Sequence, residues 1–92
     1  MKKAIRFTAE WCGPCKAYAP TFNKVAEEVK DWSFETIDVD KDLNSAQKYS
    51  IRSIPTTVFE VNGEVQEKYT GVLTSVNLVK KLELWNPTPS NT

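Results

Sequence analysis

Apolar residues recur along this chain with two different spacings, which indicate where strands and helices lie. Alternation over residues 3–8 places Ile5 and Phe7 on one face of a short strand. Residues 32–39 are rich in β-branched and aromatic side chains and predict a second strand. From about residue 14 to residue 30 the spacing becomes that of an amphipathic helix. Its apolar stripe consists of Cys15, Tyr18, Phe22, Val25, Ala26 and Val29.

A turn signal dominates the second half of the chain. Asn62 and Gly63 both tolerate positive φ angles, which suits the two-residue turn of a β-hairpin. The flanking segments, residues 56–61 and 64–70, are therefore predicted to pair as antiparallel strands. A short helix is predicted before them, around residues 44–49.

A last helix is predicted after Gly71, which ends the second strand of the hairpin. Thr74 is the expected N-cap of this helix, and Leu73 and Leu78 are placed to form a hydrophobic staple across the cap. The residues expected to supply its buried face are Val76, Val79 and Leu82.

The predicted elements follow one another as strand, helix, strand, helix, hairpin and helix. Because a helix joins the first two strands, these strands should be parallel with a right-handed crossover, whereas the hairpin adds antiparallel pairs. The expected fold class is α/β, a four-stranded mixed sheet with three helices distributed over both faces. Residues 1–85 are expected to form one domain, and residues 86–92, which are polar and contain two prolines, a flexible tail.

Composition narrows the classes of partner. The chain has 92 residues, with 12 Lys plus Arg and 12 Asp plus Glu, so its formal net charge is zero. Without an excess of positive charge, nucleic acid and anionic membrane surfaces are not expected partners. The sequence has no apolar run typical of a signal peptide or a membrane span, so the expected location is the cytoplasm.

The two cysteines, Cys12 and Cys15, are separated only by Gly13 and Pro14. This spacing suits half of a zinc site, a structural disulfide or a redox couple. A zinc site is disfavoured, and no metal is expected, because the chain has no histidine and no further cysteine. A structural disulfide is uncommon in the cytoplasm, and so short a loop would remove little entropy from the unfolded chain.

The redox interpretation has a positive argument in its favour. Cys12 is expected at the N-terminus of the first helix, where unpaired N–H groups and the helix dipole stabilise a thiolate. Pro14 suits the first helical turn, since its nitrogen needs no hydrogen bond there. Cys15, one turn further on, would be more enclosed and close enough to resolve a mixed disulfide formed at Cys12.

The segment WCGPC followed by KAYAP, with IRSIPT at residues 51–56 and NGE at residues 62–64, resembles the thioredoxin family. The resemblance extends from about Ile5 to Leu84. It implies a thioredoxin-like fold in a short form that lacks the extra N-terminal strand and helix, as in small archaeal and phage-encoded members. It also implies a protein-disulfide reductase in which Cys12 attacks and Cys15 resolves.

The resemblance further implies how the site is built and supplied with electrons. The residues expected to bind substrate are Trp11, Gly13, Pro14, Ile54, Pro55, Gly71 and Val72. Pro55 would follow a cis peptide bond, although outside this context an ordinary trans proline would be the simpler interpretation. The expected partners are disulfide-containing client proteins and a thioredoxin reductase or similar electron donor, with a monomeric protein and no bound cofactor.

Arg6 departs from the family pattern, which usually has a buried aspartate at this position to move the proton of the resolving thiol. A buried, unpaired guanidinium is costly. Arg6 is therefore expected to reach solvent or to pair with Glu35 or Asp38, and a solvated strand residue is the simpler interpretation. The alternative hypothesis is that Arg6 stabilises the thiolates and makes the couple more oxidising.

Two other functions remain open at this point. A glutaredoxin-like protein would draw electrons from glutathione, so incubating the oxidised protein with glutathione or with a thioredoxin reductase would separate the two. A thioredoxin-fold subunit of a larger complex would not need its cysteines. In that case a Cys12→Ser, Cys15→Ser variant would still sustain the cellular role.

Overall fold

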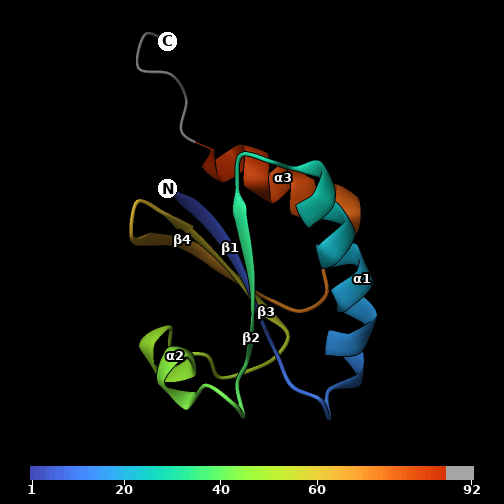
Figure 1. Cartoon of the computed structure of the whole chain (residues 1–92), viewed down its shortest axis with the longest axis vertical. Helices are drawn as coiled ribbons and strands as arrows, with labels where there is room; N and C mark the ends of the chain where they lie inside the picture. The colour runs from blue at the N-terminus through green and yellow to red at the C-terminus, as the bar shows by residue number, and fades with distance from the viewer. Residues whose placement is uncertain (87–92) are drawn as a thin grey trace, which may run out of the picture.

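The structure, a computed structural model, describes residues 1–86. Over this range the sheet has four strands in the order β2-β1-β3-β4, and Figure 1 shows it at the centre of the molecule. In chain order the strands are β1 (Lys2–Thr8), β2 (Ser33–Asp38), β3 (Thr56–Val61) and β4 (Glu64–Thr70). β1 pairs in parallel with β2 and antiparallel with β3, which pairs antiparallel with β4. The predicted mixed sheet is confirmed.

Helices cover both faces of the sheet. The helices are α1 (Gly13–Glu28), α2 (Leu43–Lys48) and α3 (Ser75–Trp85). α1 and α3 pack together over one face, where Phe22 and Leu82 share a buried cluster with Phe59 of β3. α2 lies over the other face (Figure 1). There Tyr49, at the end of α2, packs against Phe7 of β1, with ring centroids 5.6 Å apart.

The hairpin lies where the turn signal predicted it. Asn62 has a φ of 53° and Gly63 a φ of 85°, so both residues of the turn have positive φ angles. β3 and β4 have the predicted bounds, and they pair with one irregularity of register between Phe59 and Glu60. Gly71, with a φ of 117°, follows the last residue of β4 and turns the chain away from the sheet.

The start of α3 agrees with the sequence, but part of its predicted buried face does not. The Thr74 side chain accepts a hydrogen bond from the Asn77 N–H at 3.2 Å, and Leu73 and Leu78 are both buried. The prediction that Val76 belongs to the buried face was wrong, because its side chain is 61% exposed. Leu78 and Leu82, one turn apart, face the core, and Val76 lies about 200° around the helix from Leu78. Val79 is half-buried at the edge of the cluster.

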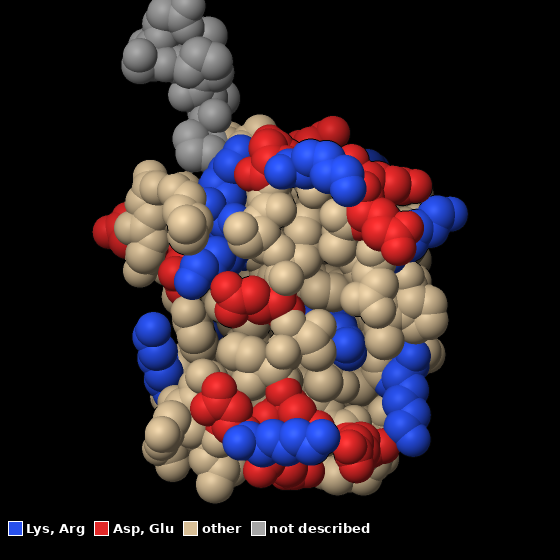
Figure 2. Space-filling model, viewed as in Figure 1, with Lys and Arg blue, Asp and Glu red and all other residues tan. Residues whose placement is uncertain are grey.

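The last helix, α3, ends at Trp85, close to the end of the described range. Asn86 is the C-cap of α3, and the other residues of the predicted tail lie outside the described range. None of the helices described within residues 1–86 is long and apolar enough to cross a membrane. Figure 2 shows acidic and basic side chains interspersed on one face rather than gathered by sign.

A polar contact joins β4 to α3. The carboxylate of Glu67 accepts hydrogen bonds from Lys81 Nζ at 2.7 Å and from Trp85 Nε1 at 2.9 Å. Burial alone would raise the pKa of Glu67, but the two hydrogen bonds and the positive charge of Lys81 outweigh it and hold the pKa below its ordinary value of 4.5. The ionised carboxylate therefore stabilises the folded state.

We expect Glu67→Gln to lower the free energy of unfolding by about 1 kcal/mol near neutral pH. Since the pKa of Glu67 is lowered by folding, this contribution is full above 4.5 and is lost as the pH falls through the folded-state pKa. Urea denaturation at neutral and acidic pH measures it, with Glu64→Gln at an exposed position as the control. A difference from wild type that stays the same at both pH values would contradict the prediction.

Candidate redox site

The two cysteines lie where β1 leads into α1. Cys12 is the N-cap of α1, and the Cys15 N–H points at its sulfur with a nitrogen-to-sulfur distance of 3.2 Å. The two residues form a disulfide whose Cα atoms are 5.2 Å apart. Cys12 retains 5% exposure, whereas Cys15 is completely buried. Cys12 therefore carries the sulfur that is nearer to solvent.

A second segment faces the cysteines from the loop before β3. The Ile54–Pro55 peptide bond is cis, as the resemblance to the family implied. The carbonyl oxygen of Ile54 lies 4.0 Å from the sulfur of Cys12, within range for an S–H donor when the pair is reduced. Ile54 also packs against the small buried cluster that contains both cysteines.

The loop after β4 is tied to this segment. The Gly71 N–H donates a hydrogen bond to the Pro55 carbonyl oxygen at 2.8 Å, and the next residue, Val72, is 47% exposed. Because the φ of Gly71 is 117°, the backbone requires glycine there. Space does not require it, since an added Cβ would meet only the Tyr69 ring at 3.8 Å.

Trp11 forms one wall of a cavity beside the disulfide. Its side chain is 71% exposed, and its indole N–H donates to the Asp40 carboxylate at 2.7 Å. The cavity has a volume of about 340 Å³ and is lined by Trp11, Val39, Ile51, Arg52, Ser53 and Ile54. Gly13 and Pro14 are exposed at the start of α1. The sequence-predicted residues of the site thus come from the start of α1, from the Ile54–Pro55 loop beside Cys12 and from the Gly71 loop that is hydrogen-bonded to Pro55.

Sequence reasoning missed four residues of this cavity: Val39, Ile51, Arg52 and Ser53. The last three belong to the IRSIPT segment, of which only Ile54 and Pro55 were predicted to bind substrate. Val39 directly follows β2, whose carboxyl end lies beside that of its parallel neighbour β1. That shared edge was a usable signal, since the cysteines follow β1 and loops after parallel strands meet at the same edge of a sheet.

The solvated interpretation of Arg6 was wrong. The Arg6 side chain is 6% exposed, and within residues 1–86 it forms no ion pair with a carboxylate. Glu35, an expected partner, instead lies 3.6 Å from Lys3 Nζ. Strand alternation places Arg6 opposite Ile5 and Phe7, on the face that α1 covers, so most of its side chain is buried under the helix.

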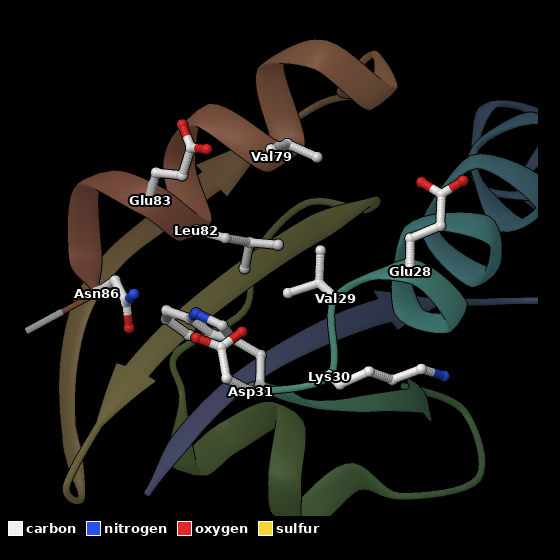
Figure 3. Close-up of a pocket in the computed structure, with 9 residues that line it drawn as sticks. Glu28, Val29, Lys30, Asp31, Val79, Leu82, Glu83 and Asn86 are labelled. Carbon is white, nitrogen blue, oxygen red and sulfur yellow. The ribbon is translucent and has the colours of Figure 1, made fainter.

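Another hollow lies away from the cysteines, at the other end of α1. Figure 3 shows it between the end of α1 and α3, with the aliphatic side chains of Val29, Val79 and Leu82 directed inward and the Glu28 and Lys30 side chains extending outward. Its volume is about 340 Å³. None of the predicted site residues lines it.

The arrangement around Cys12 defines a class of protein. A cysteine pair that closes to a disulfide at a helix N-terminus, beside a cis-proline loop, suits the exchange of a dithiol for a disulfide. The described residues contain no cluster of three or more side chains suited to hold a metal ion. The fold and the site are those of a thiol-disulfide oxidoreductase.

Comparison with known proteins identifies the family. A family model described as Thioredoxin matches residues 2–84, so the chain belongs to the thioredoxin family. The thioredoxin of Mycoplasmoides gallisepticum is 40% identical over 82 residues, which make up 89% of this chain and 82% of that protein. The thioredoxin of Buchnera aphidicola is 41% identical over 87 residues, 91% of this chain and 80% of that protein.

Solved structures agree with the family assignment. A mutant thioredoxin from Halobacterium salinarum has a TM-score of 0.88 at 31% identity, with coverage of 96% of this chain and 77% of that one. The oxidised mitochondrial thioredoxin 3 from Saccharomyces cerevisiae has a TM-score of 0.82 at 32% identity, covering 89% and 76%. The protein is thus a protein-disulfide oxidoreductase with a redox-active CXXC pair, and its family implies disulfide-containing substrates and a reductase partner.

Proposed function

We propose that this protein works in the reducing direction, with Cys12 as the attacking nucleophile and Cys15 as the resolving thiol. The difference in burial carries the assignment of these two roles, because Cys15 is completely buried and only Cys12 keeps access to a substrate. Its position as the N-cap, with the Cys15 N–H directed at its sulfur, favours the thiolate at Cys12.

The proposed cycle consists of two thiol-disulfide exchange steps. The Cys12 thiolate attacks one sulfur of a client disulfide, forms a mixed disulfide and releases the other client sulfur as a thiolate. The Cys15 thiolate then attacks the Cys12 sulfur, closes the Cys12–Cys15 disulfide and releases the second client thiolate. The client gains two electrons, and both of its thiolates take protons from solvent. A separate reductase returns two electrons to the Cys12–Cys15 disulfide.

We also propose that client segments dock on the surface around Cys12. The exposed Trp11 and Val72 and the half-buried Ile54 would give apolar contact to a client segment. Gly13, Pro14, Pro55 and Gly71 are the remaining proposed substrate-binding residues. The cavity beside Trp11 would accept one client side chain, and its lining favours an apolar one.

Family membership, and not a feature of the site, supports the proposed kind of partner. The electron donor is a thioredoxin reductase or a similar enzyme, the clients are folded or unfolded proteins that contain disulfides, and the protein acts as a monomer in the cytoplasm. Glutathione as the donor is the second candidate, but no feature of the cysteine loop favours it.

The test is a trapping experiment with Cys15→Ser. Without the resolving thiol, the mixed disulfide on Cys12 cannot be resolved. Insulin with its native disulfides and client proteins should therefore accumulate as covalent adducts that dithiothreitol releases. Adducts are separated on non-reducing gels and identified by mass spectrometry. The Cys12→Ser, Cys15→Ser double variant is the control and should trap nothing. If Cys15→Ser formed no more adduct than the double variant, the proposed roles of the two cysteines would be overturned.

A further inference from the structure

We propose that Arg6 is a positioning residue that acts through its fixed charge on the Cys12–Cys15 pair. Its guanidinium stabilises the reduced, thiolate-bearing form relative to the disulfide and so makes the protein a weaker reductant. The inference rests on the proposed function, because it concerns the redox equilibrium of the same cysteine pair.

The guanidinium lies directly beneath the first turn of α1. Arg6 Nη1 is 3.5 Å from the carbonyl oxygen of Cys15, and Nη2 is 3.4 Å from the hydroxyl oxygen of Thr36 on β2. Both contacts are at the long end of the hydrogen-bond range. The buried Nε has no hydrogen-bond partner. The charge is therefore held against the cysteine turn by packing, with little neutralising contact.

The groups that surround Arg6 do not cancel its charge. The Phe22 ring centroid lies 5.7 Å from the guanidinium carbon, an arrangement that favours a cation. The Tyr18 hydroxyl is bonded to Thr57 at 2.8 Å, and burial raises the pKa of Tyr18 to about 12, so Tyr18 is neutral near pH 7. Burial lowers the pKa of Arg6, but a guanidinium starts high enough to stay protonated at neutral pH.

An unbalanced positive charge affects the two redox states differently. The disulfide is neutral and gains little from a neighbouring cation, whereas each thiolate of the reduced pair is stabilised by it, and more strongly at a mostly buried position than at the surface. The free energy of the reduced form falls relative to the oxidised form. The equilibrium constant for disulfide formation is therefore smaller than it would be with a neutral side chain at this position.

Other charged groups lie near the cysteines, and their effect on the redox equilibrium must be the same in the variant and the wild type. They are Glu10, Lys16, Asp38, Asp40, Lys41 and Arg52, all at exposed or half-buried positions. Since Tyr18 and these groups are unchanged in an Arg6 variant, a ratio between variant and wild type isolates the charge of Arg6. Lys24→Met removes an exposed cation from α1 outside the proposed substrate-binding surface and serves as the matched control.

The test is the redox equilibrium of the full chain with dithiothreitol or glutathione buffers, measured from neutral to alkaline pH. We expect Arg6→Met to raise the equilibrium constant for disulfide formation about tenfold, which is about 30 mV for this two-electron couple. Near neutral pH, Arg6→Lys, which keeps the charge, should stay within about twofold of wild type, and Lys24→Met within about threefold. The ratio of Arg6→Met to wild type should grow with pH until the thiols of both proteins have ionised.

Each outcome bears on the inference separately from the proposed function. An unchanged or smaller equilibrium constant in Arg6→Met overturns it, as does an equal change in Arg6→Lys or a ratio that is the same at every pH. Arg6→Gln, checked for folding by circular dichroism, replaces Arg6→Met if that variant does not fold. If the Arg6 variants match wild type while Cys15→Ser still traps clients, the inference fails and the proposed function stands.

Discussion

Replacing Cys12 with serine is expected to slow protein-disulfide reduction by roughly 10³-fold or more. A thiolate is the nucleophile in disulfide exchange, and a serine hydroxyl stays protonated at neutral pH. Cys15 cannot take over the attack, because its side chain is completely buried beneath the cysteine loop. The rate is measured as the turnover of insulin with dithiothreitol as the electron source, above the rate without protein.

Cys15→Ser is the matched control for this result. Both single variants lose the Cys12–Cys15 disulfide, so any contribution of that bond to folding is removed equally from each. Cys15→Ser should still react once with a substrate disulfide and then stop, whereas Cys12→Ser should not react. A Cys12→Ser protein that formed the covalent adduct faster than Cys15→Ser would reverse the assignment of nucleophile and resolving thiol.

The largest loss of stability is expected from Phe22→Ala, at about 3–5 kcal/mol. Phe22 is 1% exposed, and its ring packs edge-on against Tyr18 and Phe34 with centroids 5.8 and 5.5 Å apart. Alanine would leave a cavity between α1 and the sheet that neighbouring helices can fill only in part. It would also remove the aromatic ring that faces the Arg6 guanidinium. Urea denaturation of the reduced protein measures the effect without the disulfide.

Two variants make this measurement specific. Phe22→Leu keeps most of the buried volume and should cost well under half as much as Phe22→Ala. Val76→Ala, at a position that was expected in the core but is 61% exposed, should change the free energy of unfolding by no more than about 0.5 kcal/mol. A comparable loss in Val76→Ala and Phe22→Ala would mean that α3 packs through the other side of its surface.

The elements that could be predicted closely are those specified by neighbouring residues. The hairpin has its predicted bounds because the two positive φ angles of its turn are properties of Asn62 and Gly63 themselves. The N-cap of α3 could be predicted for the same reason, since the Thr74 side chain accepts a hydrogen bond from a backbone N–H only three residues further on. Cys12 and Cys15 can meet because one helical turn separates them, whatever the rest of the chain does.

The burial of Arg6 could not be predicted from neighbouring residues. Alternation along the strand correctly separates its side chain from those of Ile5 and Phe7, but it does not say which face a helix will cover. α1 returns over the Arg6 face because its own apolar stripe must be buried there, and that contact joins residues far apart in the chain. The preference of arginine for solvent was outweighed by the burial of the whole stripe.

The cavity beside Trp11 also depends on contacts between residues that are far apart in the chain. Val39 and Asp40 reach Trp11 because two parallel strands end at one edge of the sheet, and Ile54 reaches Cys12 from a loop more than forty residues away. Motif and local spacing were thus sufficient for the strands, the turn, the helix caps and the cysteine pair, which depend on nearby backbone geometry. The burial of Arg6, the exposure of Val76 and the lining of the site depend on how distant elements pack, and only the tertiary structure decided them.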